Sequence, residues 1–213
     1  MLVLAVDTAT PSVTAGVVAV DGSSPEVLAT LVTVDARAHG ELLTPHILGA
    51  LDDAGHALPD LDAIVCGVGP GPFTGLRAGM ATAGALGHAL GVPVHPVRTL
   101  DAIAAGTTGH LLVTTDARRR ELYWATYADG VALTNPAVDR PADVPADAPR
   151  RAGTTLYGDV LTMPHTGEEY PTPLGLVTAA LGQLDRPARP LVPLYLRRPD
   201  ATVPGTRKRV TAP

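Results

Sequence analysis

The sequence is poor in the residues on which several large enzyme classes depend. Its 213 residues include one lysine, Lys208 near the end of the chain, and only three serines. A P-loop places a lysine against the nucleotide phosphates, and a Schiff-base enzyme needs one in a pocket. No G-x-S-x-G nucleophile motif occurs. The composition therefore argues against P-loop nucleotidases, Schiff-base enzymes and serine hydrolases.

Cysteine, aromatic side chains and positive charge are also scarce. The single cysteine, Cys66, lies in a predicted strand, where we expect a small buried hydrophobic residue. Aromatic residues make up 3% of the chain and the net charge is −5 at pH 7. A protein that binds RNA by itself usually shows a basic face or stacking aromatic residues. Because no signal peptide or membrane-spanning run is evident, we expect a cytoplasmic protein with no membrane partner.

The most distinctive stretch that the chain does contain is 63–91. A strand over 63–67 leads into the loop Gly69-Pro70-Gly71-Pro72 and a helix over 73–90, which Gly91 ends. Each glycine inside a helix costs about 0.5–1 kcal/mol relative to alanine. Small residues nevertheless recur at every fourth position of this helix, at Gly75, Gly79, Ala83 and Gly87. Such a stripe lets another backbone approach closely, either inside its own domain or in a partner.

The first 106 residues predict one lobe. Three strands with short connections form an antiparallel meander, and helices and strands then alternate. Pro45 either kinks the first helix or occupies its first position. This order is the ribonuclease-H-like pattern, in which an acidic residue at the end of the first strand is placed for chemistry. The predicted elements are strands 2–7, 12–20 and 26–34 with a turn over 21–25 between the last two, a helix over 39–54, the strand 63–67, the helix 73–90 and a strand over 92–97.

The second half begins as the first does, with a strand, an aspartate, a turn and a second strand. Strand 111–115 ends in Asp116, and strand 121–127 pairs back on it through Arg118-Arg119-Arg120. This weak internal repeat indicates an α/β protein with two ribonuclease-H-like lobes of the actin-like ATPase (ASKHA) superfamily, the second lobe reduced. The predicted division is 1–106 for the first lobe, 107–200 for the smaller second lobe and 201–213 for a disordered tail, with a helix over 99–105, a loop over 135–151, a strand over 155–160 and a helix over 174–184.

The aspartates that end the two first strands are the leading candidates for a functional site. In two-lobed actin-like ATPases, an Asp-x-[Thr/Ser] turn from one lobe and its equivalent from the other approach the nucleotide phosphates. Asp7, Thr8 and Asp116 occupy those places. Short side chains and free backbone N–H groups suit phosphate or Mg²⁺-bound water. The alternative, which the motif alone favours, is an aspartate that accepts hydrogen bonds from turn amides.

Other polar groups give weaker signals. The loop 69–72 precedes a helix N-terminus and could hold an anion, but its two prolines remove donors and favour a structural turn. His39 and His46 are seven residues apart rather than three or four, so no metal site is predicted. Arg118-Arg119-Arg120 is either a solvated charge run, which is favoured, or a contact to phosphate or RNA. No catalytic residue is assigned.

Five segments together resemble one known family. They are LAVDTA (4–9), HGELLTP (39–45), GVGPGPFTGLRAG (67–79), VTTDAR (113–118) and PLYLR (193–197). The run G-P-G-P-F-T-G-L-R-x-G is highly specific, and the resemblance covers most of the chain, least of it in 135–170. The segments are similar to those of the TsaB (YeaZ) family, bacterial partner proteins in tRNA threonylcarbamoyladenosine biosynthesis.

The resemblance implies a two-lobed actin-like fold and a role in tRNA modification. The family acts where a threonylcarbamoyl group is placed on the adenosine beside the anticodon of certain tRNAs. Its members are non-catalytic dimerisation subunits, whereas the catalyst is the related, longer TsaD, which holds a metal with a His-x-x-x-His pair. Those two histidines correspond here to Thr99 and Ile103. The resemblance therefore implies no metal site and no transferase activity for this chain alone.

The resemblance also implies partners and a pairing surface. A TsaD-like catalytic subunit and a TsaE-like ATPase are the expected partners, tRNA is contacted indirectly, and the chain alone forms a homodimer. No cofactor is expected on the chain alone, and ATP or ADP with Mg²⁺ at the partner interface stays open. The alternative function is an ATP-dependent phosphotransferase or ATPase acting through Asp7 and Asp116. The pairing surface is expected on the helices 39–54 and 73–90, at His39, Leu43, Ile47, Phe73, Gly75, Leu76, Gly79, Met80 and Ala83.

Overall fold

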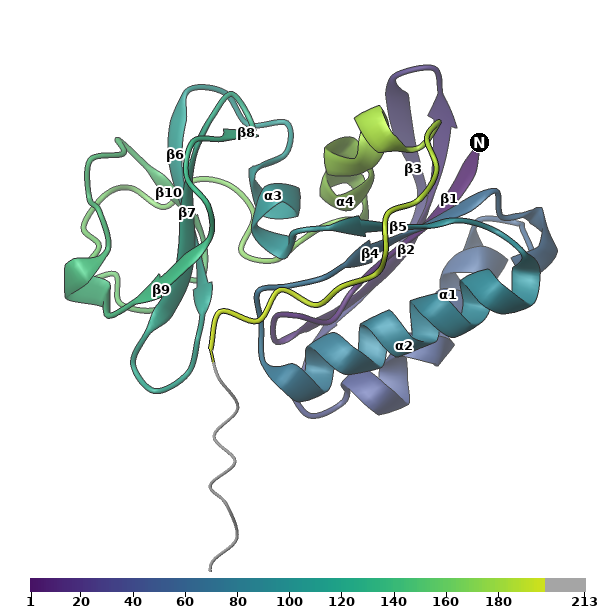
Figure 1. Ribbon diagram of the computed structural model, residues 1–213, viewed down its shortest axis with the longest axis horizontal. Coiled ribbons are helices and arrows are strands. Elements are labelled where there is room, and N and C mark those ends of the chain that lie inside the picture. Colours follow the sequence, from purple (N-terminus) through teal and green to yellow (C-terminus); the bar gives the residue numbers. More distant parts are fainter. Residues whose placement is uncertain (198–213) are drawn as a thin grey trace, which may run out of the picture.

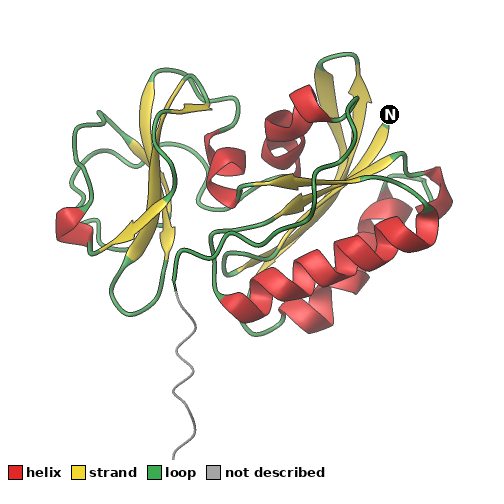
Figure 2. Ribbon diagram, in the orientation of Figure 1, coloured by secondary structure: helices red, strands yellow, loops and turns green. Residues whose placement is uncertain are grey.

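The computed structural model describes residues 1–197, so the predicted tail 201–213 lies outside the described residues. Two β-sheets form two lobes that lie next to each other (Figure 1). Helices gather around the first sheet, whereas the second lobe consists mostly of strands and loops (Figure 2). None of the helices in residues 1–197 is long and apolar enough to cross a membrane.

The first sheet has the strand order β3-β2-β1-β4-β5. The first three strands are antiparallel, and β4 and β5 run parallel to β1, which confirms the ribonuclease-H-like order. Every residue of β1 is buried, because a central strand covered on both faces needs apolar side chains in both directions. The strands are β1 (Leu2–Asp7), β2 (Ser12–Asp21), β3 (Ser24–Val34), β4 (Ala63–Gly67) and β5 (Val94–Val97). The turn between β2 and β3 is thus shorter than predicted.

Two helices that pack against each other cover one face of the first sheet. They are α1 (His39–Asp53), which lies over β2 and β3, and α2 (Phe73–Leu90), which lies over β1 and β4 (Figure 1). Pro45 lies inside α1 rather than at its first position. Gly91 ends α2 in the left-handed conformation, with φ of 70°, which glycine adopts without a steric penalty.

The opposite face of the first sheet is covered by α4 (Pro173–Ala180), which comes from the end of the chain. The Thr172 side chain caps this helix by accepting the Gly175 N–H at 3.0 Å. Buried apolar residues of α4 pack against those of β1, β2 and β4. The structure therefore assigns α4 to the first lobe, although the predicted division placed 107–200 in the second. The physical reason is that the apolar second face of β1 needs a cover.

The second sheet repeats the topology of the first with shorter elements. Its order is β10-β6-β7-β8, with β6 and β7 antiparallel and β10 parallel to β6. The same relations hold for β4-β1-β2-β3 in the first sheet, so the predicted internal repeat is confirmed. The strands are β6 (His110–Asp116), β7 (Leu122–Ala128), β8 (Val131–Ala132), β9 (Ala137–Asp139), which pairs with β7, and β10 (Arg151–Gly153). Helix α3 (Thr99–Ala104) precedes this sheet.

Two predictions for the second lobe were wrong. The strand predicted over 155–160 is a turn, in which Tyr157 has a φ of 59° and its carbonyl accepts the N–H groups of Val160 and Leu161. The strand that pairs with β6 is β10, which lies at the end of the predicted loop and beyond it. That loop also contains β9. Short 3₁₀ helices occupy Leu58–Asp60, Pro141–Asp143 and Leu181–Gln183.

Candidate functional site

The turn after β1 is closed over its own aspartate. Asp7 has no exposed surface; its Oδ1 accepts the Ala9 N–H at 2.7 Å, and its Oδ2 accepts the Thr99 hydroxyl at 2.7 Å. Burial raises the pKa of Asp7 to about 6, against the opposing effects of these two hydrogen bonds and of His39. Both carboxylate oxygens are therefore used inside the first lobe.

Thr8 joins the same turn to helix α2. Its hydroxyl donates to the Gly75 carbonyl at 2.7 Å and accepts the Gly79 N–H at 3.1 Å. A Cβ at Gly79 would lie 2.3 Å from Thr8 Oγ1, and one at Gly75 would lie 2.5 Å from the Thr8 carbonyl oxygen. Of the two interpretations of the small-residue stripe, the structure therefore shows packing inside the chain's own lobe.

Eight of the nine residues expected at the pairing surface are buried within the chain. Phe73 is half-buried, with its ring 4.8 Å from that of Tyr195 in an edge-on contact. The reason is that helical periodicity identifies the side of a helix that is buried, and here that side faces the sheet. The outer side of the two helices consists of other residues. The buried eight are His39, Leu43, Ile47, Gly75, Leu76, Gly79, Met80 and Ala83.

Asp116 ends the first strand of the second lobe in a more open setting. Its Oδ1 accepts the Arg118 N–H at 2.8 Å, and its Oδ2 lies 3.5 Å from the Arg118 guanidinium. The Asp116 side chain is 16% exposed. Because Asp7 has no exposed surface, the structure does not present the two carboxylates to a common ligand.

The predicted loop before α2 is a packed turn. Gly69 has a φ of 93°, and the Gly69–Pro70 peptide bond is cis. Gly71 lies so close to the first turn that an added Cβ would be 2.1 Å from the Ala9 carbonyl oxygen. At Gly69 and Gly71 the structure therefore confirms the interpretation of this loop as a structural turn.

The histidines considered for a metal site each have a separate partner. His39 Nε2 donates to the Thr10 carbonyl at 2.8 Å, and His46 Nε2 is hydrogen-bonded to the Thr33 hydroxyl at 2.9 Å. Within residues 1–197, no three His, Cys, Asp or Glu side chains gather in a way that could hold a metal ion.

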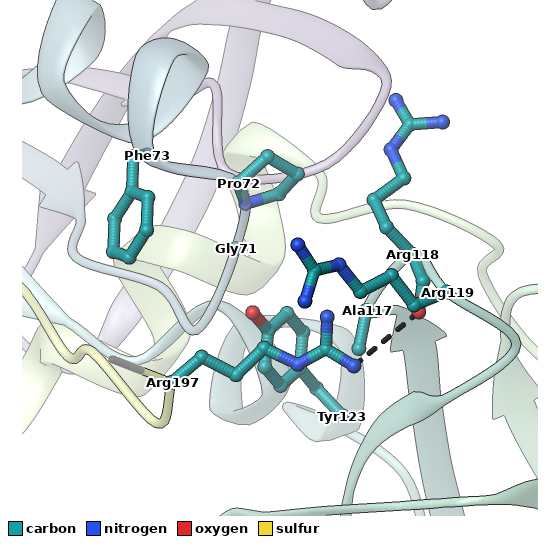
Figure 3. Close-up of a pocket in the computed structure, with 8 residues that line it drawn as sticks. All are labelled: Gly71, Pro72, Phe73, Ala117, Arg118, Arg119, Tyr123 and Arg197. Atoms are coloured by element: carbon teal, nitrogen blue, oxygen red, sulfur yellow. Dashed lines mark hydrogen bonds between the residues drawn. The ribbon is translucent and has the colours of Figure 1, made fainter. Parts of the chain in front are cut away.

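A pocket of about 160 Å³ opens where the two lobes meet (Figure 3). Three chain segments line it: the start of α2 with the two residues before it, the turn between β6 and β7 with the start of β7, and the segment after α4. Its lining residues are Gly71, Pro72, Phe73, Ala117, Arg118, Arg119, Tyr123 and Arg197. A second hollow of about 210 Å³ shares Pro72 and Arg118 and extends to Thr8 and His39.

Sequence reasoning missed this pocket as a unit. It singled out the loop 69–72 and the run 118–120 separately, and it quoted Arg197 and its neighbours only as part of a resemblance. The signal that could have joined them is the internal repeat, because it places the turn after Asp116 near the first lobe. The contribution of Arg197 depends on how the end of the chain folds back.

The sequence and the fold are both similar to those of known proteins. The family model described as tRNA N6-adenosine threonylcarbamoyltransferase (TsaD) matches residues 26–184. An uncharacterized protein of Mycobacterium tuberculosis is 58% identical over 200 residues, which cover 93% of each chain. The Escherichia coli protein TsaB, named for tRNA threonylcarbamoyladenosine biosynthesis, is 33% identical over 132 residues, covering 60% of this chain and 55% of that one.

A solved structure supports the same relationship. YeaZ from Pseudomonas aeruginosa superimposes with a TM-score of 0.74 at 25% identity and covers 91% of this chain and 100% of that one. The predicted α/β fold with two actin-like lobes is thereby confirmed.

Proposed function

Because this chain belongs to the TsaB (YeaZ) branch of the threonylcarbamoyltransferase family, we propose that it is a non-catalytic subunit that pairs with a TsaD-like catalyst. The chain takes part in the biosynthesis of threonylcarbamoyladenosine in tRNA. In the proposed complex the partner carries the transferase chemistry, a TsaE-like ATPase takes part, and tRNA is contacted mainly through the partner.

The observation that supports the non-catalytic role concerns the two positions that correspond to the catalyst's metal-binding histidines. In this chain Thr99 and Ile103 occupy them, and both make contacts inside the fold. Thr99 donates its hydroxyl to the buried Asp7 carboxylate at 2.7 Å, and Ile103 packs in an apolar cluster of α3 and the second sheet. Isoleucine offers no ligand atom, and the threonine hydroxyl already has a buried partner. These two residues serve the fold.

The alternative of an ATPase or phosphotransferase acting through Asp7 and Asp116 has less support. A carboxylate that orders Mg²⁺-bound water needs an accessible oxygen. Asp7 is fully buried and accepts hydrogen bonds on both oxygens from Ala9 and Thr99.

The pairing surface that we propose is the outer side of α1 and α2. The core sides of both helices are buried, so a partner can reach only the opposite side. There Leu48 of α1 is 50% exposed. The exposed residues on the outer side of α2 include Ala81, Ala85 and Ala89, with the half-buried Ala78 beside them, and these small side chains allow a second helix to approach closely. The larger exposed residues of the same helix are Thr74, Arg77 and His88.

The family match gives a reason for this choice of partner. The TsaD model covers α1 and α2 of this chain, so a TsaD-like protein carries the corresponding pair of helices. Identical chains pair through equivalent surfaces about a two-fold axis, and related chains can do so approximately. The same surface would serve a homodimer of the chain alone and the heterodimer with the catalyst.

The test introduces charge on the outer side of α2. Ala81 and Ala85 are exposed, so the double variant Ala81→Arg, Ala85→Arg should fold, while burying two unpaired charges should weaken pairing at least tenfold, or about 1.4 kcal/mol. The control is Val131→Arg in β8, a residue that is 68% exposed and lies in the other lobe. Co-purification with the TsaD-like protein and mass analysis of nucleosides from treated tRNA measure the two effects.

Two results would contradict the proposal. One is a double variant that still pairs and supports tRNA modification as well as the Val131→Arg control. The other is robust modification of tRNA by the isolated chain when an activated threonylcarbamoyl donor is supplied. The first result would remove the surface assignment alone, and the second would remove the non-catalytic role.

A further inference from the structure

A hollow of about 430 Å³, the α3–α4 pocket, lies where the end of β5, the helix α3 and the end of α4 meet. These three elements are neighbours in the fold (Figure 1). In the described part of the chain, the α3–α4 pocket shares no lining residue with the pocket of Figure 3. It lies on the side of the first sheet that α4 covers, away from α1 and α2. Its polar lining residues are Arg98, Asp101, Gln183 and Arg189.

Tight packing holds the walls of the α3–α4 pocket together. A Cβ added at Gly175 of α4 would lie 2.1 Å from the Ala102 carbonyl oxygen of α3, so the two helices meet backbone to backbone. Val97, which lines the pocket, belongs with Ala102 to a buried apolar cluster between α4 and the first sheet. These elements cannot separate without opening a packed core. The hollow is therefore present before any ligand binds.

An ion pair fixes one arginine of the α3–α4 pocket. Arg98 Nε donates to Asp101 Oδ2 at 2.7 Å, and the hydroxyl of the buried Tyr127 donates to Asp101 Oδ1 at 2.8 Å. Both oxygens of Asp101 thus have a partner inside the chain. Within residues 1–197, the two Nη groups of Arg98 have no such partner, and the Arg98 side chain is 34% exposed. The ion pair orients the guanidinium and leaves these two donor groups available.

Two further polar side chains line the α3–α4 pocket without a partner among the described residues. They are the amide of Gln183, in the 3₁₀ helix after α4, and the exposed guanidinium of Arg189, in the segment that follows. Together with Arg98, three side chains therefore offer unused hydrogen-bonding groups to one hollow. A few polar groups that converge on a pre-formed pocket of roughly 300–1,000 Å³ are typical of small-molecule sites.

The charge of the α3–α4 pocket indicates the class of ligand. Two arginines and one aspartate leave the lining with one net positive charge, which matches one carboxylate better than a doubly charged phosphate. Phosphate sites commonly use backbone N–H groups. At the start of α3, the N–H groups of Thr99, Asp101 and Ala102 already donate to backbone carbonyls. Guanidinium groups bind carboxylates through paired, charge-assisted hydrogen bonds.

We infer that the α3–α4 pocket binds a small organic acid that has one carboxylate and a hydroxyl or amino substituent. Arg98 and Arg189 hold the carboxylate. The Gln183 amide, which can both donate and accept, binds the substituent. The apolar part of the lining, which includes Val97 and Ala179, leaves room for a short carbon chain. This site is separate from the proposed pairing surface, because α1 and α2 lie on the other face of the first sheet.

The sequence supplies a specific reporter for the test. Gln183 is the only glutamine of the chain and Asn135 the only asparagine, so the side-chain amide signals in an NMR spectrum of the ¹⁵N-labelled protein belong to these two residues. Asn135 is exposed in the second lobe and serves as the internal control. The full chain is titrated at pH 7 and constant ionic strength with lactate, L-alanine, propionate and inorganic phosphate. We expect lactate or L-alanine to shift the Gln183 signals saturably, with half-saturation below about 10 mM, and to leave Asn135 unchanged.

The ligands separate the two possible substituents. Tighter binding of lactate identifies a hydroxy acid, and tighter binding of L-alanine identifies an amino acid. Propionate has the carboxylate without the substituent and should bind at least threefold more weakly than the better of the two. Equal binding of lactate, L-alanine and propionate would overturn the role given to Gln183.

Variants test the arginines. Arg98→Ala and Arg189→Ala should each weaken binding at least tenfold, because each removes a charge-assisted contact. The matched control is Arg186→Ala, which removes the same charge from the same exposed segment but lies outside the pocket lining, and it should change affinity less than twofold. Thermal melts show that the proteins compared are folded. If Arg98→Ala loses its melting transition, Arg189→Ala decides, because Arg189 is exposed.

Four results would overturn the inference. They are no saturable shift of Gln183 with lactate or L-alanine up to about 10 mM, parallel shifts of Gln183 and Asn135, equal losses in Arg186→Ala and the pocket variants, or phosphate binding as tight as that of the better acid. The titration uses this chain without a partner and a site on the other face of the first sheet. Its failure would therefore leave the proposed pairing intact.

Discussion

In both lobes the first strand ends in an aspartate whose Oδ1 accepts the backbone N–H two residues further on, at 2.7 Å for Asp7 and at 2.8 Å for Asp116. Beyond that shared hydrogen bond the two turns differ. The second oxygen of Asp7 accepts the hydroxyl of Thr99 in a fully buried site. The second oxygen of Asp116 lies near the Arg118 guanidinium at a partly exposed edge. One local motif therefore has two environments in one chain.

The difference follows from what covers each turn. In the first lobe, α2 follows β4 and packs on the turn through Thr8. In the second lobe, the helix that follows β10 is α4, and it packs on the first sheet instead. The turn after Asp116 therefore has no equivalent cover and borders the pocket between the lobes. The same local motif is therefore fully buried in the first lobe and borders a pocket in the second, according to the segments that pack on it.

The largest expected effect comes from disrupting the cover of the first turn. Gly79→Leu would place a side chain where even a Cβ lies 2.3 Å from Thr8 Oγ1. We expect a loss of about 3 kcal/mol or more in the free energy of unfolding, because overpacking also separates the Thr8 hydroxyl from its two backbone partners. Urea unfolding followed by circular dichroism measures it.

The matched control for that change is Ala81→Leu, on the exposed side of the same helix, with an expected change within about 0.5 kcal/mol. A folded Gly79→Leu monomer of normal stability would show that α2 does not close the turn as the structure indicates.

The next effect is a pH dependence that belongs to the first turn. The folded pKa of Asp7 is about 6, above its ordinary value of 3.8, so the folded state binds the proton more tightly than the unfolded chain. Protonation of Asp7 therefore contributes fully to the free energy of unfolding below about pH 3.8, and this contribution is lost as the pH rises through about 6. The difference between the folded and the ordinary pKa of Asp7 corresponds to about 3 kcal/mol in the free energy of unfolding. Asp7→Asn should remove this decline, as urea unfolding at several pH values would show.

The second lobe supplies the comparison for this experiment. Asp116→Asn changes an equivalent, partly exposed carboxylate and should leave the decline between pH 4 and 7 as it is in the unaltered chain. If the decline disappears in Asp116→Asn and persists in Asp7→Asn, the assignment of the buried carboxyl is wrong.

The smallest expected effect is a gain in stability in the second turn. Arg120 has a φ of 61°, so Arg120→Gly should relieve left-handed strain of about 1 kcal/mol, partly offset by the greater freedom of glycine in the unfolded chain. A net gain of about 0.5 kcal/mol in thermal unfolding is expected. Arg120→Ala keeps the strain and should show no gain. Equal stability of the two variants would indicate that the turn is not strained.

Much of the first lobe was predictable from local patterns. The alternation of short strands and helices placed every element of the first sheet, and the glycine-rich run located α2 with its stop at Gly91. Patterns failed where tertiary contacts decide. The segment 155–160 has the composition of a strand, but Tyr157 turns the chain there and β10 takes the place beside β6.

The candidate sites show the same limit. The sequence pattern of α1 and α2 identified residues such as Leu43 and Gly79, which are buried, because periodicity marks the side that faces the core. The outer side, with Leu48 and the alanines of α2, has no strong pattern of its own. Neither Asp7 nor Asp116 could be assigned an environment from its turn, since both turns have the same local form.

The sequence by itself determined the fold class, the repeated strand-and-aspartate opening of the two lobes, and the family, because these depend on short-range periodicity and on a specific run of residues from Gly69 to Gly79. Only the tertiary structure decided that α4 covers the first sheet, that Thr99 closes over Asp7, and that Arg197 joins the turn after Asp116. The physical reason is that burial and electrostatic environment are set by segments far apart in the chain. A local sequence pattern does not predict which distant segment will cover a given turn.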